Sequence, residues 1–208
     1  MRSMYNKIVK RCFDFVIALL MLIVVSPILL VLSIAVRINL GRPILFKQER
    51  SGRGMKSFKI MKFRTMSDKR NMNGNLLPDH LRVTRLGVFL RSSSLDELPE
   101  LINILIGDMS FIGPRPLPTA YNPYYTESEK ARFNVRGGLV PPDSVDPNPI
   151  ISWDKQLEYE SEYGNSVSFV KDLKIIVGVF RILLKRGAED YGSFERKALN
   201  EERKDMSV

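Results

Sequence analysis

The longest apolar stretch of the chain runs from Phe15 to Val36 without a formal charge. A straight helix of this length would reach about 33 Å, enough to cross a hydrocarbon core of about 30 Å. The stretch is too long for a secretory signal, and no cleavage pattern of small residues ends it. It therefore predicts a helix inserted in a membrane.

Two features of this stretch argue against a simple transmembrane span. Ser26–Pro27 lies in its middle, where proline removes an N–H group and clashes with the preceding turn, while Ser26 can satisfy a freed carbonyl. Basic residues flank both ends, namely Arg2, Lys7, Lys10 and Arg11 before it and Arg37, Arg42, Lys47, Arg50 and Arg53 after it. The positive-inside rule favours the cytoplasm for both flanks. We predict a re-entrant helix–break–helix that enters and leaves by the same face; an ordinary kinked transmembrane helix is the alternative.

The pattern after the membrane stretch predicts a β-hairpin over residues 43–66, with a glycine-rich turn at Ser51–Gly54. In the second strand and its continuation, Lys62 and Arg64 alternate with apolar residues. These two cations either bind a phosphate or a headgroup, or form a solvated basic face of the strand. The interleaving alone favours the solvated face.

Helical periodicity resumes behind an acidic pair, Asp96–Glu97. Apolar residues recur at the spacing of one buried helix face: Leu98, Leu101, Ile102, Leu105 and Ile106. A helix start concentrates free N–H groups and positive dipole, which keep a carboxylate ionised. The pattern also fits capping, either by a Ser94–Glu97 capping box or by Asp96 as N-cap with Pro99 in the first turn. Capping and chemistry are compatible, because a cap exposes the carboxylates.

A rigid arginine follows this helix in Pro114–Arg115–Pro116, where two stiff residues hold the guanidinium between them. Arg91 lies in a short amphipathic segment that leads to the acidic pair. Ionised carboxylates, a seat for a metal ion and a fixed arginine together are typical of a site for phosphate chemistry.

The remaining pattern alternates short helices with irregular chain. Helices are predicted over residues 126–135, 152–163 and 169–185, and irregular chain over 67–79, 114–123 and 137–149. The helix over 169–185 is basic and amphipathic, which favours a position in the membrane interface, with core packing as the alternative. The charged residues from Ala188 predict a disordered tail.

These elements predict a mostly helical α+β fold: a re-entrant membrane helix, a small β-hairpin and amphipathic interfacial helices. The expected divisions are a membrane helix over 1–40, a catalytic domain over 41–187 and a charged tail over 188–208.

Composition narrows the chemistry further. The chain has 208 residues and a formal net charge of +9, with 32 Lys and Arg against 23 Asp and Glu, which suits anionic partners. The single cysteine, Cys12, excludes an internal disulfide and a cysteine-rich zinc site. The single histidine, His80, argues against a histidine-based triad or a centre with several histidine ligands.

Four motifs resemble a known family. They are Ser26–Pro27, Phe58–Met66 (FKIMKFRTM), Ser94–Pro99 (SLDELP) and Gly107–Pro116 (GDMSFIGPRP). Together they are similar to the small monotopic phosphoglycosyl transferases, the bacterial sugar transferases that begin polyprenyl-linked glycan assembly. The resemblance covers roughly residues 5–185, and the chain resembles the minimal catalytic form without an extra four-helix membrane domain.

The resemblance implies a two-step, Mg²⁺-dependent reaction at the cytoplasmic face of the bacterial inner membrane. Asp96 would attack the β-phosphorus of a UDP-sugar, release UMP and pass the phosphosugar to polyprenyl (undecaprenyl) phosphate. Asp96 would also contact Mg²⁺, and Glu97 would place the metal or handle a proton. The expected substrate-binding residues are Lys62, Arg64, Arg91, Pro114, Arg115 and Pro116. No nucleic acid partner is expected, and a homodimer is compatible with the sequence but not demanded by it.

One region departs from the family. Where the family has a Pro-Gly-(Ile/Leu)-Thr-Gly-Trp-Ala-Gln-Val-Asn-Gly-Arg-Asn pattern, this chain has Gly137–Pro149, with Asp146 and Asn148 near the missing Gly-Arg-Asn. We interpret this as altered donor selectivity, with an amino sugar suiting the added acidic residues. The sequence does not fix the sugar, the polyprenol length, the glycan pathway or the role of Glu97.

Two other functions remain open. A basic, non-enzymatic membrane module that binds lipid explains the charge but not the acidic pair beside a fixed arginine. A lipid-phosphate phosphatase would use the same aspartate and release free phosphate instead of UMP. Both enzymes need Asp96, whereas a binding module should survive its loss.

Overall fold

This computed structural model describes residues 4–148, 151–185 and 196–204. Its elements are η1 (Tyr5–Val9), α2 (Lys10–Leu40), β1 (Leu45–Ser51), η2 (Arg53–Met55), β2 (Ser57–Phe63), α3 (Asp79–Arg82), α4 (Arg85–Ser92), η3 (Leu95–Glu97), α5 (Glu100–Ile106), β3 (Met109–Ile112), η4 (Thr119–Tyr124), η5 (Glu129–Asn134), β4 (Gly137–Val140), η6 (Pro142–Val145), α6 (Trp153–Ser166), α7 (Phe169–Lys185) and α8 (Leu199–Glu202). The predicted α+β, mostly helical class is confirmed.

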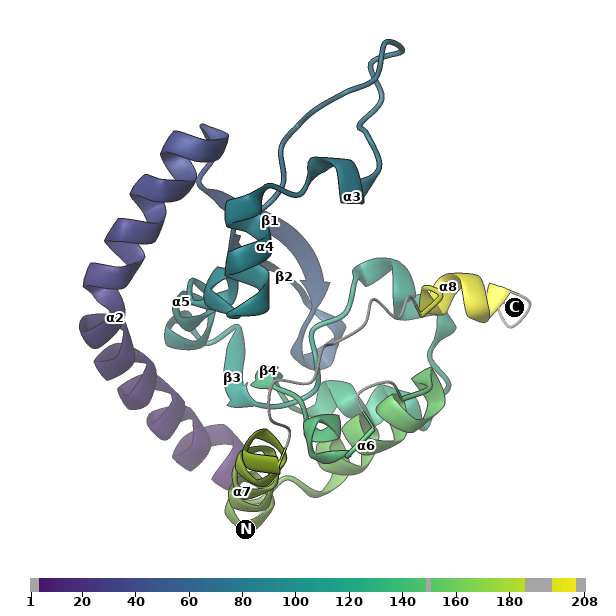
Figure 1. Ribbon diagram of the computed structural model, residues 1–208. Helices are drawn as coiled ribbons and strands as arrows, with labels where there is room; N and C mark the ends of the chain where they lie inside the picture. The colour runs from purple at the N-terminus through teal and green to yellow at the C-terminus, as the bar shows by residue number, and fades with distance from the viewer. Residues whose placement is uncertain (1–3, 149–150, 186–195, 205–208) are drawn as a thin grey trace.

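The apolar stretch forms one long helix, α2, which arcs along one side of the molecule with the other elements on its concave side (Figure 1). Pro27 lies inside it without ending it, so the predicted break between two helices is wrong. The predicted role of Ser26 is confirmed, because its Oγ donates to the Ile23 carbonyl at 2.8 Å. That carbonyl would otherwise bond the N–H that proline lacks. Re-entrant insertion stays a prediction.

The first turns of α2 anchor it to the rest of the chain. Lys10 Nζ lies 2.6 Å from Asp172 of α7, and Arg11 donates to the carbonyls of Ile104 and Leu105 at 2.6 Å each. The Phe111 N–H donates to Asp14 Oδ1 at 3.1 Å. These charges thus hold α2 against α5, β3 and α7.

The outer side of α2 is apolar and uncovered. Only 6% of its most hydrophobic 18-residue window is buried, and α2 is the one helix in the described part of the chain that is long and apolar enough to cross a membrane. A second uncovered apolar face lies on α7, made by Phe169, Val170, Leu173, Ile176, Val177 and Phe180. Whether these faces contact lipid stays a prediction.

The predicted β-hairpin is confirmed as β1 and β2, antiparallel from the Leu45–Phe63 pair to the Ser51–Ser57 pair. Asn103 of α5 is fully buried against the open edge of β2. Its amide donates to the Lys59 carbonyl at 2.9 Å and accepts from the Met61 N–H at 3.0 Å. One side chain therefore fixes where α5 lies along the hairpin.

A second sheet, which the sequence did not predict, pairs β3 with β4 in parallel. The expectation that residues 137–149 lack regular structure is wrong for Gly137–Val140, which form β4, and for Pro142–Val145, which form the 3-10 helix η6. The glycines of β4 allow a close approach of two backbones: a Cβ on Gly138 would lie 2.1 Å from the Gly113 nitrogen.

The expectation of irregular chain over 114–123 is wrong for its second half, which belongs to the 3-10 helix η4. The remaining predicted segments hold with shifted bounds. The amphipathic segment before the acidic pair forms α3 and α4, the segment over 126–135 forms η5, and α6 and α7 cover the last two predicted helices. The expected loop over 67–79 is irregular and projects away from the body in Figure 1. The tail is not disordered where it is described, because Leu199 of α8 is fully buried. Its remaining residues lie outside the described part.

Candidate active site

The acidic pair lies in η3, a single 3-10 turn between α4 and α5. The capping prediction is wrong for both residues. Ser94 has a left-handed backbone (φ 54°), whereas an N-cap needs an extended one, and it makes no side-chain cap. Pro99, not Asp96, precedes the first residue of α5. The carboxylates of Asp96 and Glu97 are therefore not used as caps of these helices.

Lys62 brings the hairpin to the acidic pair. Its Nζ lies 2.5 Å from Glu97 Oε1 and 3.2 Å from Oε1 of Glu100, a residue that the sequence reasoning missed. The Glu100 side chain is only 4% exposed. Burial, with repulsion from Glu97, raises the pKa of Glu100 to about 7 against the attraction of Lys62. One lysine thus joins Glu97 of η3 to Glu100 at the start of α5.

Asp96 is half-buried and has no ion pair among the described residues. Burial raises its pKa, Glu97 adds to the rise, and Lys62 and Arg91 oppose it. Arg91 is exposed, and its Nε donates to Thr65 Oγ1 at 3.0 Å. Asp96 therefore lies in the field of two cations without being neutralised by direct contact with either.

Arg64 is not brought to the acidic pair. It is 8% exposed and donates to the carbonyls of Leu40, Arg42 and Met66 at 3.1 Å each. Its other terminal nitrogen pairs with Asp68 at 2.5 Å. Since these contacts occupy the guanidinium in holding the end of α2 to the hairpin, we leave Arg64 out of the proposed site.

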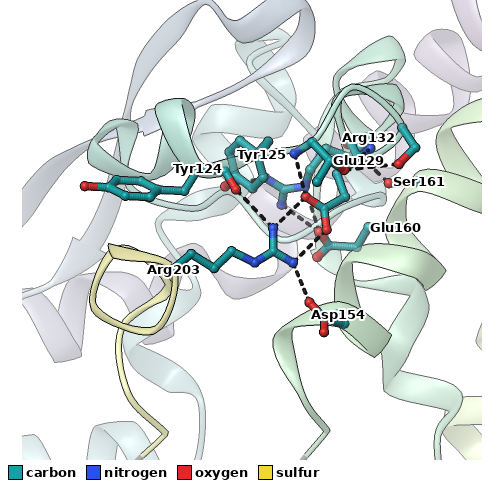
Figure 2. Close-up of polar contacts among 10 residues, drawn as sticks. Tyr124, Tyr125, Glu129, Arg132, Asp154, Glu160, Ser161 and Arg203 are labelled. Atoms are coloured by element: carbon teal, nitrogen blue, oxygen red, sulfur yellow. Dashed lines mark hydrogen bonds and ion pairs between the residues drawn. The ribbon is translucent and has the colours of Figure 1, made fainter. Parts of the chain in front are cut away.

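Arg115 is exposed between the buried rings of Pro114 and Pro116. Its backbone is held at both polar groups: its N–H donates to Glu160 Oε1 at 2.9 Å, and its carbonyl accepts from Arg132 Nη2 at 2.6 Å. Glu160 and Arg132 form a fully buried ion pair (Figure 2). The guanidinium of Arg115 has no partner among the described residues, and its charge opposes the rise in the pKa of Glu100. The structure thus fixes the backbone and leaves the cation available near the acidic end of α5.

The donor set fits a magnesium ion shared with a substrate. The described residues contain no group of three or more His, Cys, Asp or Glu placed to hold a metal alone. Mg²⁺ in phosphate chemistry usually takes one or two carboxylates and fills its shell with phosphate oxygens and water. The unpaired carboxylate of Asp96 meets that requirement.

Residues 137–149, the segment that departs from the family pattern, interact electrostatically with Arg115 through Asp143. Burial, with repulsion from Glu160, raises the pKa of Asp143 in η6 to about 6, while Arg115 opposes the rise. Asp146 is engaged elsewhere, because Lys155 lies 2.7 Å from its Oδ2. Of the acids in this segment, Asp143 is thus the one whose pKa is affected by the charge of Arg115.

A separate basic cavity lies at the other end of α5. It has a volume of about 530 Å³ and includes Arg53, Lys56 and Arg136 in its lining, with Asp108 as its one acid. Arg136 donates to the Gly107 carbonyl at 2.8 Å. None of the predicted site residues lines this cavity, and no sequence pattern indicated it.

Comparison with known proteins bears on the family of the chain. The family described as "Bacterial sugar transferase" matches residues 5–186. The uncharacterized sugar transferase EpsL of Bacillus subtilis (strain 168) is 42% identical over 88% of this chain and 91% of its own length. A UDP-glucose:undecaprenyl-phosphate glucose-1-phosphate transferase of Klebsiella pneumoniae is 35% identical over 88% of this chain and 42% of its length. The protein of the same name from Caulobacter vibrioides is 36% identical over 84% of this chain and 69% of its length.

Proposed function

Because the chain belongs to the bacterial sugar transferase family, we propose that it transfers a sugar 1-phosphate from a UDP-sugar to polyprenyl phosphate and releases UMP. The observation that carries this proposal is the unpaired, half-buried Asp96 in the field of Lys62 and Arg91, with the charge of Arg115 acting on Glu100 at the start of α5. A carboxylate among cations that neutralise a phosphate is the arrangement that attack on phosphorus needs.

In the first step, an oxygen of Asp96 forms a bond to the β-phosphorus of the donor. The bond between that phosphorus and the bridging oxygen breaks, and UMP leaves with the electron pair. In the second step, a phosphate oxygen of the polyprenyl phosphate attacks the same phosphorus and restores the Asp96 carboxylate. The product is a polyprenyl diphosphate sugar.

The neighbouring side chains have distinct roles in this scheme. Lys62 and Arg91 favour the ionised form of Asp96. Arg115 supplies a cation for the diphosphate, on a backbone held by Glu160 and Arg132. A Mg²⁺ ion held by Asp96 and the donor phosphates would neutralise their charge. Glu97 and the buried Glu100 hold Lys62 in place.

The apolar faces of α2 and α7 support a position on the membrane for this site. A lipid acceptor carries its phosphate at headgroup depth, so the acidic pair must lie near the lipid surface. We place the catalytic domain on the cytoplasmic face of the bacterial inner membrane, with α2 inserted as a re-entrant, monotopic anchor. In that arrangement both basic flanks of α2 stay in the cytoplasm.

UDP-glucose is the first donor to consider, because relatives with 35–36% identity are named as glucose-1-phosphate transferases. Asp143, in the segment that departs from the family pattern, is the residue we propose to influence donor choice, since its charge acts on Arg115. UDP-linked amino sugars should therefore be tested as donors beside UDP-glucose.

The test is UMP release from a panel of UDP-sugars by detergent-solubilised protein with Mg²⁺ and undecaprenyl phosphate. We expect UMP from the wild type and a loss of at least about 10³-fold in Asp96→Asn, because the nucleophile is removed. Asp79→Asn, a change of an exposed carboxylate in α3, should keep full activity. UMP release by Asp96→Asn at the wild-type rate would refute the proposal, and free phosphate in place of UMP would favour a phosphatase.

A further inference from the structure

The match to the family ends at residue 186, but the chain returns to the catalytic domain beyond it. We call residues 196–204 the C-terminal brace. Its Leu199 is fully buried in a cluster with Leu117, Tyr125, Phe133, Trp153 and Leu157. The Trp153 indole donates to the Lys197 carbonyl at 2.9 Å. The brace is therefore part of the core that lies under η4 and α6.

Arg203 fastens one end of the brace. It donates to both carboxylate oxygens of Glu129, at 2.7 and 2.8 Å, and to the Tyr124 carbonyl at 3.0 Å. It also pairs with Asp154, and Figure 2 shows its guanidinium between these acids. The Arg203 side chain is only 7% exposed. This bidentate, buried arrangement is the stronger kind of ion pair, so it holds the brace in one place.

Arg196 connects the other end of the brace to the candidate active site. It donates to Gln156 Oε1 at 2.7 Å and to the Ile151 carbonyl at 2.7 Å, and its guanidinium lies 3.5 Å above the Trp153 ring. The Gln156 amide donates to Glu160 Oε1 at 3.1 Å. The same oxygen of Glu160 accepts from the backbone N–H of Arg115 at 2.9 Å. Three hydrogen bonds thus lead from Arg196 to the backbone of Arg115.

We propose that the C-terminal brace positions Arg115 for the donor diphosphate, with Arg196 as a positioning residue that acts through Gln156 and Glu160. Stabilisation of a developing charge requires a cation that is already in place, and an error of a fraction of an ångström weakens it. Arg196 orients Gln156 so that its amide meets Glu160, and Glu160 in turn fixes the Arg115 N–H. This inference rests on the proposed function, in which Arg115 binds the diphosphate.

The kinetic test is a double-mutant cycle on UMP release with the most active donor of the panel. Arg196→Met keeps a linear side chain over Trp153 but removes the guanidinium. We expect it to lower kcat/KM by about tenfold in the wild-type background, and by less than about twofold in Arg115→Ala, because the positioned cation is then absent. Gln156→Met interrupts the same path at its next residue and should match Arg196→Met. Lys171→Gln, which removes an ion pair to Glu162 elsewhere on α6, should change neither background.

A second measurement does not depend on activity. Residue-resolved amide exchange should be faster at Arg115 in Arg196→Met, while the Gly113 amide, which bonds the Val140 carbonyl at 3.2 Å, keeps its protection. Unchanged exchange at Arg115, or equal losses of kcat/KM in both backgrounds, would overturn the positioning role and leave the brace as a stabilising element. Wild-type protein that makes no UMP would instead refute the proposed function, and the exchange measurement would still decide the role of the brace.

Discussion

Lys62 and Arg64 show what a pattern of residues can and cannot predict. Their alternation with apolar side chains predicted two equivalent cations. Lys62 contacts the acidic pair, whereas Arg64 is turned to the carbonyls at the end of α2. The difference depends on Leu40, the last residue of α2, which lies 24 residues before Arg64. The periodicity of a strand carries no information about where a distant helix ends. Glu100 was missed for a related reason, because its role depends on Lys62, which comes beside it only when the hairpin packs on α5.

At the residue scale, Asp143 should make stability fall as pH rises. An unfolded aspartate ionises near pH 4, whereas burial raises the pKa of Asp143 to about 6 in the fold. The folded state therefore holds more protons between these values, and the stability that this gives is complete below pH 4 and lost above pH 6. Asp143→Asn should raise the free energy of unfolding at pH 7.5 by roughly 1–3 kcal/mol and leave it nearly unchanged at pH 4.

Thermal unfolding in detergent at both pH values measures this effect, and Asp146→Asn is the matched control. Hydrogen bonding to Lys155 lowers the pKa of Asp146, so its stabilisation is present at neutral pH and lost as pH falls. Its replacement should lower Tm at pH 7.5. A lower Tm for Asp143→Asn at pH 7.5 would show that the Asp143 carboxylate is stabilising instead.

At the element scale, strong periodicity predicted the hairpin and the helices α2, α6 and α7, while the short elements were missed. β3 and β4 have four residues each, and Gly137 and Gly138 read as breakers because their role depends on Gly113 across the sheet. The prediction of a break in α2 gave proline too much weight. The Ser26 hydroxyl satisfies the freed carbonyl, so the helix bends and continues.

Gly138→Ala tests the close approach between β3 and β4. The added Cβ would lie 2.1 Å from the Gly113 nitrogen, so the backbones must separate just before Pro114–Arg115–Pro116. We expect a loss of roughly 2–4 kcal/mol in the free energy of unfolding and a fall in kcat/KM. Gly74→Ala is the control, because it has a positive φ but open space around its Cβ, and about 1 kcal/mol is expected there. Equal effects of Gly138→Ala and Gly74→Ala would show that backbone conformation, and not steric overlap of the added Cβ, determines the loss of stability.

At the scale of the whole molecule, the tail was the largest failure of sequence reasoning. Its charge predicted disorder, but Arg203 pairs with Glu129 and Asp154, which lie 74 and 49 residues earlier. Amino-acid composition does not show which residues far apart in the sequence will pair. The long helix α2 was predicted from its apolar length alone, while its anchoring by Lys10, Arg11 and Asp14 becomes visible only in the folded chain.

The orientation of α2 gives a prediction for the whole chain. If α2 enters and leaves by one face, its two ends must be labelled from the same side. The single native cysteine, Cys12, is exposed near the start of α2. An Ile38→Cys change in a Cys12→Ala background marks the other end, where Ile38 is 79% exposed. An impermeant maleimide should label both in inverted membrane vesicles and neither in right-side-out spheroplasts; labelling from opposite sides would indicate a transmembrane helix.

The covalent step at Asp96 is the central claim, and the mass of the intact protein tests it most directly. Detergent-solubilised protein is mixed briefly with Mg²⁺ and the donor that gives UMP, without acceptor, and quenched. We predict a mass increase of one sugar phosphate, located at Asp96 by peptide mapping, removed by undecaprenyl phosphate and absent in Asp96→Asn. An adduct on another residue, or rapid turnover with no adduct at any time after mixing, would contradict the account.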